Sequence, residues 1–242
     1  MISVLTRNYR MIQKSLAMRG VVKTISYAAT WPLVVYKERR SLVERNAIQS
    51  DFDGRHGTDT GGFIPLSSFT IDNPNWVHGV RYAPTSPQGF GASLSLLDLS
   101  ADRYPDFTFV DVGSGKGATL LYAGDLGFKA VVGIEFVEQL HQIALKNLGV
   151  YPSTRKIGRS VCADASLFEM PAPPLVVFLN YPFSSQDLMQ AVIRNVSRCG
   201  RGPKYLIALN FPYDPAMLPD CKLRMIKKRM GADRGNYAFE VL

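Results

Sequence analysis

The chain has 242 residues, of which 46% are hydrophobic and 20% charged, and its formal net charge is +8 at pH 7. This ordinary globular composition excludes a disordered or fibrous chain. No apolar run approaches the roughly 18 residues that a membrane span needs, and the N-terminus lacks the pattern of a secretory signal. The three cysteines (Cys162, Cys199 and Cys221) lack metal-ligand spacing. We therefore expect a cytoplasmic protein with reduced cysteines and no bound metal.

The positive charge is concentrated at the two ends of the chain. Residues 1–50 carry nine Lys and Arg against two Asp and Glu, a net charge of +7. Residues 51–200 carry a net charge of −3, and residues 201–242 carry +4. Residues 1–50 are therefore a candidate surface for weak contact with an anionic membrane or nucleic acid, with a solvated helix face as the plain alternative.

The first part of the chain predicts helices followed by turns. Apolar residues recur at helical spacing over 1–19, with basic residues between them, and a more apolar stretch at 21–35 follows. We predict a basic helical appendage over residues 1–50. Residues 51–84 are dense in Gly, Pro, Asp and Asn, which predicts a turn-rich connecting segment.

A domain of alternating strands and helices is expected over residues 85–242. Thr85 or Ser86 is positioned to cap a first helix that continues to about Leu99. Apolar runs predict strands at 107–112, 130–136, 158–163, 175–179 and 205–210, and helical patterns lie at 118–127, 139–148 and 184–199. Two further runs, 222–229 and 237–242, predict an antiparallel hairpin. The fold class expected is α/β: a doubly wound, mostly parallel seven-strand sheet with a C-terminal antiparallel hairpin, preceded by the helical appendage.

The strongest chemical signal is a glycine-rich loop between the first predicted strand and its helix. The sequence runs Val110-Asp111-Val112-Gly113-Ser114-Gly115-Lys116-Gly117-Ala118. Glycines let the backbone turn sharply there, and a helix N-terminus offers free N–H groups. A phosphate-cradling P-loop needs Ser or Thr after the lysine, so Gly117 excludes it. A dinucleotide loop still fits the glycine pattern, and so does an S-adenosylmethionine loop.

Three carboxylates follow or end successive strands and bear on this choice. Glu135 ends the second strand, where it suits a ribose in either alternative. Asp111 precedes the first glycine by two positions, where it would repel a pyrophosphate but oppose the ammonium group of an amino-acid cofactor. Asp164 follows the third strand, where it can accept a hydrogen bond from an adenine amine. These positions favour S-adenosylmethionine, with a nicotinamide-dependent oxidoreductase as the alternative enzyme. A membrane-peripheral or nucleic-acid-binding protein with a scaffold α/β domain is the alternative outside enzymes.

Residues 111–117, 133–135, 163–165 and 180–183 resemble the seven-strand class I S-adenosylmethionine-dependent methyltransferases, a fold-level likeness that spans about 85–242. Segments 57–62 (GTDTGG) and 82–85 (YAPT), with His141, look like a poorly characterised bacterial group of this class. The resemblance implies that Gly113, Ser114, Gly115 and Gly117 lie under the methionyl part of the cofactor, with Asp111 near its amine. It also implies that Glu135 binds the ribose, that Phe136 flanks the adenine, and that Asp164, followed by Ala165, binds the adenine amine.

The resemblance extends to the acceptor side of the site. Asn180-Tyr181-Pro182-Phe183 follows the fourth strand and resembles the Asn-Pro-Pro-aromatic motif of enzymes that methylate planar nitrogens. It also resembles a segment of seven-strand histone lysine methyltransferases, and Tyr181 departs from the first of these patterns. Asn180 and Tyr181 are therefore the candidate substrate-side residues, and a nitrogen nucleophile is the candidate acceptor. We expect Tyr82 to pack rather than react, His141 to be structural, and Lys116 to point to solvent.

Overall fold

A computed structural model of the chain describes residues 43–44, 46–71, 73–231 and 234–242. The helices predicted within residues 1–42 lie outside the described residues. The chain divides into two units, residues 1–47 and 48–242, and the described residues 43–44 and 46–47 of the first are helical. The predicted division at residues 50 and 84 stays a prediction. The fold below is that of the second unit.

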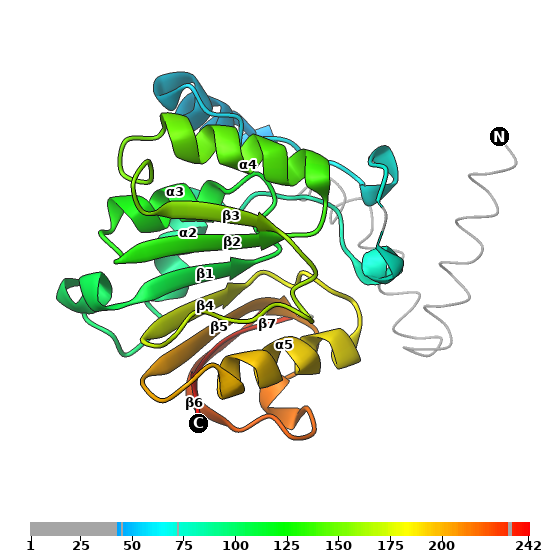
Figure 1. Ribbon diagram of the computed structural model, residues 1–242, viewed down its shortest axis with the longest axis vertical. Helices are drawn as coiled ribbons and strands as arrows, with labels where there is room; N and C mark the ends of the chain where they lie inside the picture. The colour runs from blue at the N-terminus through cyan, green and yellow to red at the C-terminus, as the bar shows by residue number, and fades with distance from the viewer. Residues whose placement is uncertain (1–42, 45, 72, 232–233) are drawn as a thin grey trace, which may run out of the picture. The chain divides into compact units, whose positions relative to one another are not determined.

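A seven-stranded sheet forms the centre of this unit, in the order β3-β2-β1-β4-β5-β7-β6 (Figure 1). Strands β1 to β5 are parallel to one another, and β7 lies antiparallel between β5 and β6. The predicted fold class is therefore confirmed for the sheet and its C-terminal hairpin. The strands are β1 Thr108–Val112, β2 Ala130–Glu135, β3 Gly158–Cys162, β4 Leu175–Leu179, β5 Lys204–Phe211, β6 Leu223–Met230 and β7 Gly235–Val241.

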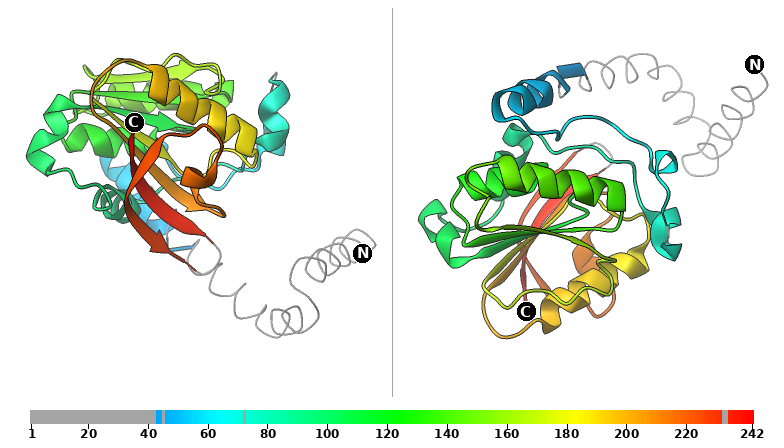
Figure 2. Two further views of the ribbon diagram at one scale, coloured as in Figure 1. Left: turned by 90° about the horizontal axis from the view of Figure 1, so that it is seen from below. Right: turned by 45° about the horizontal axis from the view of Figure 1, so that its top comes forward.

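Helices cover both faces of the sheet, which explains why the central strands are apolar on both sides. Helices α2 to α4 lie on one face and α5 on the other, as the right-hand view of Figure 2 shows. Alternation along β1 sends Phe109 into the core beneath α2 and α3, and Val110 and Val112 into the core beneath α5. The helices are α2 Pro87–Leu94, α3 Ala118–Asp125, α4 Glu138–Val150 and α5 Gln186–Arg198.

The first helix of the predicted domain begins as expected but ends early. The Ser86 side chain accepts the Gly89 N–H and caps α2, with Pro87 in the first turn. The helix ends at Leu94 and not near Leu99, because the chain tightens into Leu96–Ser93 and Leu97–Leu94 hydrogen bonds. The chain then enters the short 3-10 helix η3 Ala101–Asp106, which leads into β1.

The segment before α2 crosses the carboxyl ends of the strands, and we call residues 57–71 and 73–86 the strap. It follows a helix over residues 48–56 and contains the 3-10 helices η1 Leu66–Ser68 and η2 Pro74–His78. Its ends pair with each other through a bridge between Ile64 and Tyr82, and Gly79 pairs with Phe183 beyond β4. The strap is the cyan stretch that passes the arrowheads of the strands in Figure 1.

Four of the eight Lys and Arg residues of the C-terminal region lie in β6, one of the two edge strands of the sheet. Arg224 and Lys228 of β6 face acidic neighbours, Glu240 and Asp214. Charged side chains on an edge strand disfavour pairing with another chain, a role that the basic residues of β6 fit. Among the described residues, no helix combines the length and the hydropathy that a bilayer crossing requires.

Candidate active site

The glycine-rich loop is held against the end of β2 by main-chain hydrogen bonds. The N–H groups of Gly113 and Ser114 both donate to the Ile134 carbonyl, at 2.9 and 3.2 Å. Gly113, Gly115 and Gly117 have φ values of +75°, +54° and +84°, which lie in the left-handed region that glycine tolerates. The loop therefore needs glycine at all three positions for its backbone conformation.

Two of these glycines also permit a close approach of side chains from elsewhere in the chain. A Cβ atom at Gly115 would lie 2.2 Å from Cε2 of the Tyr82 ring. A Cβ atom at Gly113 would lie 2.8 Å from Cβ of Pro182. Tyr82 and Pro182 therefore lie against the loop at these two positions, and the predicted contact of Gly113 and Gly115 with a cofactor stays a prediction. Gly117 lies at the N-cap of α3, where a Cβ atom would contact Ala144.

Asp111 lies in β1 just before the loop and is buried. Burial raises the pKa of its carboxyl from 3.8 to about 7, against the hydrogen bond from the Thr119 hydroxyl, which lowers it, and with the Glu135 charge, which raises it further. A cationic ligand group beside Asp111 would favour the ionised carboxylate.

Glu135 connects the loop to the end of β2. Its two carboxylate oxygens accept the N–H groups of Gly115 and Val137, at 2.8 and 2.9 Å. Burial raises the pKa of Glu135, although these main-chain donors lower it. An ionised carboxylate has about four acceptor positions, so both oxygens can still accept a ligand hydroxyl.

Two adjoining pockets open beside these residues, and the empty space in them, counted together with the solvent at their mouths, is about 640 and 350 Å³. Gly113, Phe136 and Pro182 line both of them. The larger, which we call the first pocket, is also lined by the predicted site residues Asp111, Ser114, Gly115, Glu135 and Asn180. The second pocket is lined by Asp164 and Ala165 and by the apolar side chains of Ile134, Ala163 and Phe183. Of the predicted site residues, Gly117 and Tyr181 line neither pocket.

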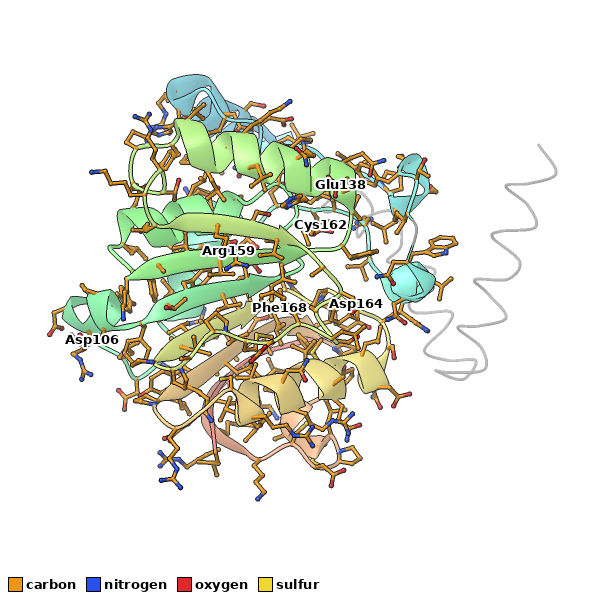
Figure 3. The ribbon with its side chains drawn as sticks, viewed as in Figure 1. Asp106, Glu138, Arg159, Cys162, Asp164 and Phe168 are labelled. Atoms are coloured by element: carbon orange, nitrogen blue, oxygen red, sulfur yellow. The ribbon has the colours of Figure 1, made fainter. Side chains whose placement is uncertain are left out.

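Asp164 borders the second pocket, just beyond the end of β3 (Figure 3). One carboxylate oxygen accepts the N–H and hydroxyl of Ser166, and the other accepts the side-chain amide of Asn75 at 2.7 Å. Burial raises the pKa of Asp164. The hydrogen bonds from Ser166, Asn75 and Asn73 lower it by more than burial raises it, so the net pKa lies below 3.8. Asp164 is thus an ionised group that ties the strap to the pocket, and it also caps a turn.

Asn180 follows β4 and lines the first pocket. Its side-chain N–H donates to Thr85 Oγ1 at 3.0 Å, and its carbonyl oxygen accepts the side-chain amide of Asn210 at 2.6 Å. Tyr181 instead turns away at a φ of +45° and packs its ring edge-on against Phe211. The two substrate-side candidates are therefore separated, because neighbouring residues at a strand end point in different directions.

Lys116 is buried, so the expectation that it points to solvent is wrong. Its ammonium group donates to Asp59 Oδ1 at 2.6 Å and to the Gly61 carbonyl at 2.9 Å. Single-sequence reasoning missed this pair because the partners come from the turn-rich segment, where spacing in the sequence does not indicate which residue a polar group meets. The dense GTDTGG motif at 57–62 is the signal that could have found it. His141, by contrast, is buried and hydrogen-bonded to Ser160, which confirms a structural role.

The residues around both pockets fit an adenosyl amino-acid ligand. The hydroxyl of Ser114 is buried beside the first pocket without a partner among the described residues, which leaves a free polar group there. Asp111 and Glu135 provide carboxylates for an ammonium group and for hydroxyls, and the second pocket combines an apolar lining with Asp164. Linings that combine apolar side chains with a few convergent polar groups, as here, are typical of small-ligand sites.

Comparison with known proteins gives similarity at the level of structure. No protein-family model and no curated protein sequence matches the chain. A proposed methyltransferase from Escherichia coli is 17% identical and superposes with a TM-score of 0.53 over 74% of this chain and 98% of its own. A proposed methylase from Haemophilus influenzae is also 17% identical, with a TM-score of 0.51 over 66% of this chain and 99% of its own. The strand order and these superpositions show that the chain has the seven-strand Rossmann-like fold of class I methyltransferases.

Proposed function

We propose that this protein is an S-adenosylmethionine-dependent methyltransferase. The observation that carries the proposal is the row of Asp111, Glu135 and Asp164 at the carboxyl ends of three neighbouring parallel strands, beside a glycine-rich loop and two adjoining pockets. In open α/β sheets, ligands bind at this edge. The proposed relatives from Escherichia coli and Haemophilus influenzae support the same class of reaction.

Each carboxylate has a distinct proposed task. Asp111 would accept the ammonium group of the methionyl part, since its burial makes an opposite charge strongly favourable. Glu135 would accept the two ribose hydroxyls with its remaining acceptor positions. Asp164 would accept the adenine amine in place of its long hydrogen bond from Asn73, with Phe136 and Ala165 packed against the ring. A dinucleotide is disfavoured because Asp111 would face its pyrophosphate.

S-adenosylmethionine supplies the activated methyl group on a sulfonium, so the protein mainly orients the nucleophile and excludes water. In the first pocket, Asn180 would contact the acceptor. Thr85 and Asn210 fix the orientation of its amide, which retains one N–H and one carbonyl lone pair. This combination suits a nitrogen nucleophile, the acceptor that the sequence motif predicts.

The direct test is calorimetry of the full chain with S-adenosylmethionine, with S-adenosylhomocysteine and with NAD+. We expect both adenosyl ligands to bind and NAD+ to give no heat. If neither adenosyl ligand binds at millimolar concentration, the proposal is overturned. If NAD+ alone binds, the protein is an oxidoreductase instead. Transfer of tritium from methyl-labelled S-adenosylmethionine to fractions of a bacterial extract then tests turnover, with the Asn180→Ala variant as the control for the acceptor side.

A further inference from the structure

Asp53 organises the GTDTGG motif of the strap. Its carboxylate accepts the hydroxyls of Thr58 and Thr60 at 2.7 and 2.6 Å, and the N–H groups of Thr60 and Gly61 at 2.9 Å each. Gly57, at a φ of +68°, makes the turn that returns the chain to Asp53. The motif is therefore a rigid turn built around one carboxylate.

Lys116 joins this turn to the glycine-rich loop. The Lys116 side chain is only 8% exposed, and its ammonium group lies between Asp59 and the Gly61 carbonyl. Three donors on a buried ammonium need such partners, because an unpaired buried charge is costly. The loop that lines the first pocket thus has an anchor in the strap.

Asn147 of α4 completes the connection, and we call Asp59, Lys116 and Asn147 the clasp. The side-chain oxygen of Asn147 accepts the Asp59 N–H, and its side-chain N–H groups donate to the main-chain carbonyls of Asp59 and Lys116, each at 2.8 Å. All three partners are main-chain groups, so they also fix the orientation of the amide. The clasp therefore binds the backbone of the strap to the backbone of the loop.

Tyr82 lies at the point where this connection meets the first pocket. Its hydroxyl donates to the Thr60 carbonyl at 2.6 Å, and its ring lies over Gly115 and lines the pocket. The Lys116 ammonium is 5.7 Å from the centre of the same ring. Burial raises the pKa of Tyr82 well above 10.0, so the hydroxyl remains a donor and the ring remains an uncharged wall.

We propose that Lys116 is a positioning residue that holds Tyr82 as a wall of the cofactor pocket, so that closing the clasp and binding the cofactor favour each other. The proposal rests on the proposed function. It makes the strap part of the cofactor site, and it explains why the motifs at 57–62 and 82–85 occur in one chain with the glycine-rich loop. Coupling between two events is reciprocal, so cofactor binding must also stabilise the clasp.

The test measures S-adenosylhomocysteine affinity by calorimetry in the wild type, Lys116→Met and Asp59→Asn. We expect about 10-fold weaker binding for Lys116→Met, since hydrogen bonds to a charged group are lost. The effect of Asp59→Asn should be smaller, because the Asp59 side chain is 61% exposed, and this variant keeps the test valid if Lys116→Met does not fold. Lys204→Met is the matched control, because Lys204 is also buried, donates to two carbonyls and lies at the opposite end of the sheet.

Hydrogen exchange provides the reciprocal measurement. In the wild type, S-adenosylhomocysteine should slow amide exchange over residues 57–62 and 82–85, and this protection should be reduced in Asp59→Asn and lost in Lys116→Met. Loss of thermal stability in Lys116→Met with wild-type affinity, or wild-type binding without protection of the strap, would overturn the positioning role and leave the methyltransferase proposal intact. Absence of any binding by the wild type would instead overturn the proposed function.

Discussion

The ring of Tyr82 lies directly on Gly115, so that a Cβ atom at residue 115 would be 2.2 Å from the ring. A residue from the strap therefore limits which side chain the glycine-rich loop can carry at residue 115. Tyr82 is held at its other end by the Thr60 carbonyl, so it has little freedom to move aside.

We expect Gly115→Ala to destabilise the protein more than Gly127→Ala does. Both residues have a positive φ, +54° and +78°, but a Cβ atom at Gly127 meets nothing within 4 Å. The difference in the free energy of unfolding, measured in guanidinium chloride, should be about 1–3 kcal/mol, the usual cost of overpacking. In a Tyr82→Ala background, Gly115→Ala and Gly127→Ala should lower the free energy of unfolding by the same amount. If the difference between them is unchanged there, the Tyr82 ring is not what opposes a side chain at residue 115.

The Asp111→Asn variant should become progressively more stable than the wild type as pH rises. The pKa of Asp111 is about 7 in the folded protein, and its ordinary value is 3.8. The unfolded chain therefore loses its proton first, so the contribution of Asp111 to the free energy of unfolding is fully present below pH 3.8 and is lost as pH rises towards 7. Over that window the contribution falls by up to about 1.4 kcal/mol per pH unit. Urea unfolding of both proteins between pH 5 and pH 8 measures the difference, and a pH-independent difference would show an ordinary pKa.

Cofactor binding should release protons near pH 7. Asp111 is partly protonated in the free protein at this pH, and a neighbouring ammonium group would favour its ionised form. Calorimetry with S-adenosylhomocysteine in buffers of different ionisation enthalpy measures the release, and the affinity should rise as pH increases through 7. In Asp111→Asn the part of the release due to Asp111 should disappear, and an unchanged value would place the ammonium group elsewhere.

Replacing Glu135 by Gln should weaken S-adenosylhomocysteine binding about 10- to 100-fold. The amide that replaces one oxygen is a donor, so it opposes the N–H of Gly115 or Val137 and removes acceptors for the ribose. Glu138→Gln is the control, because Glu138 is an exposed residue at the start of α4 (Figure 3). Equal affinities for the two variants would mean that Glu135 has no contact with the ligand.

Deleting residues 1–42 should remove any binding to anionic lipid and leave cofactor affinity unchanged. These residues carry a net charge of +7, and charge of that sign is attracted to anionic surfaces. The deletion must stop before residue 49, because Gln49 donates to Tyr122 and Thr60 within the second unit. Cosedimentation with vesicles containing phosphatidylserine at physiological salt is the measurement, and equal binding by both chains would exclude these residues as the lipid surface.

The sequence by itself determined the strand and helix order, the glycine loop and the carboxylates beside it. These follow from local patterns: apolar runs predict the strands, and positions after strand ends predict which side chains meet at one edge of the sheet. Thus Asp111, Glu135 and Asp164 were identified as site candidates from their places in the chain alone.

Only the tertiary structure decided what lies over the loop. Lys116 and Asp59 are 57 positions apart, and Tyr82 reaches Gly115 because the strap crosses the strand ends. Such contacts depend on how a segment without periodicity packs, and turn-forming residues predict only that the chain bends. The turn-rich segment therefore also forms a wall of the first pocket. It is held there because its polar groups hydrogen-bond to Lys116 of the glycine-rich loop and to Asn147 of α4.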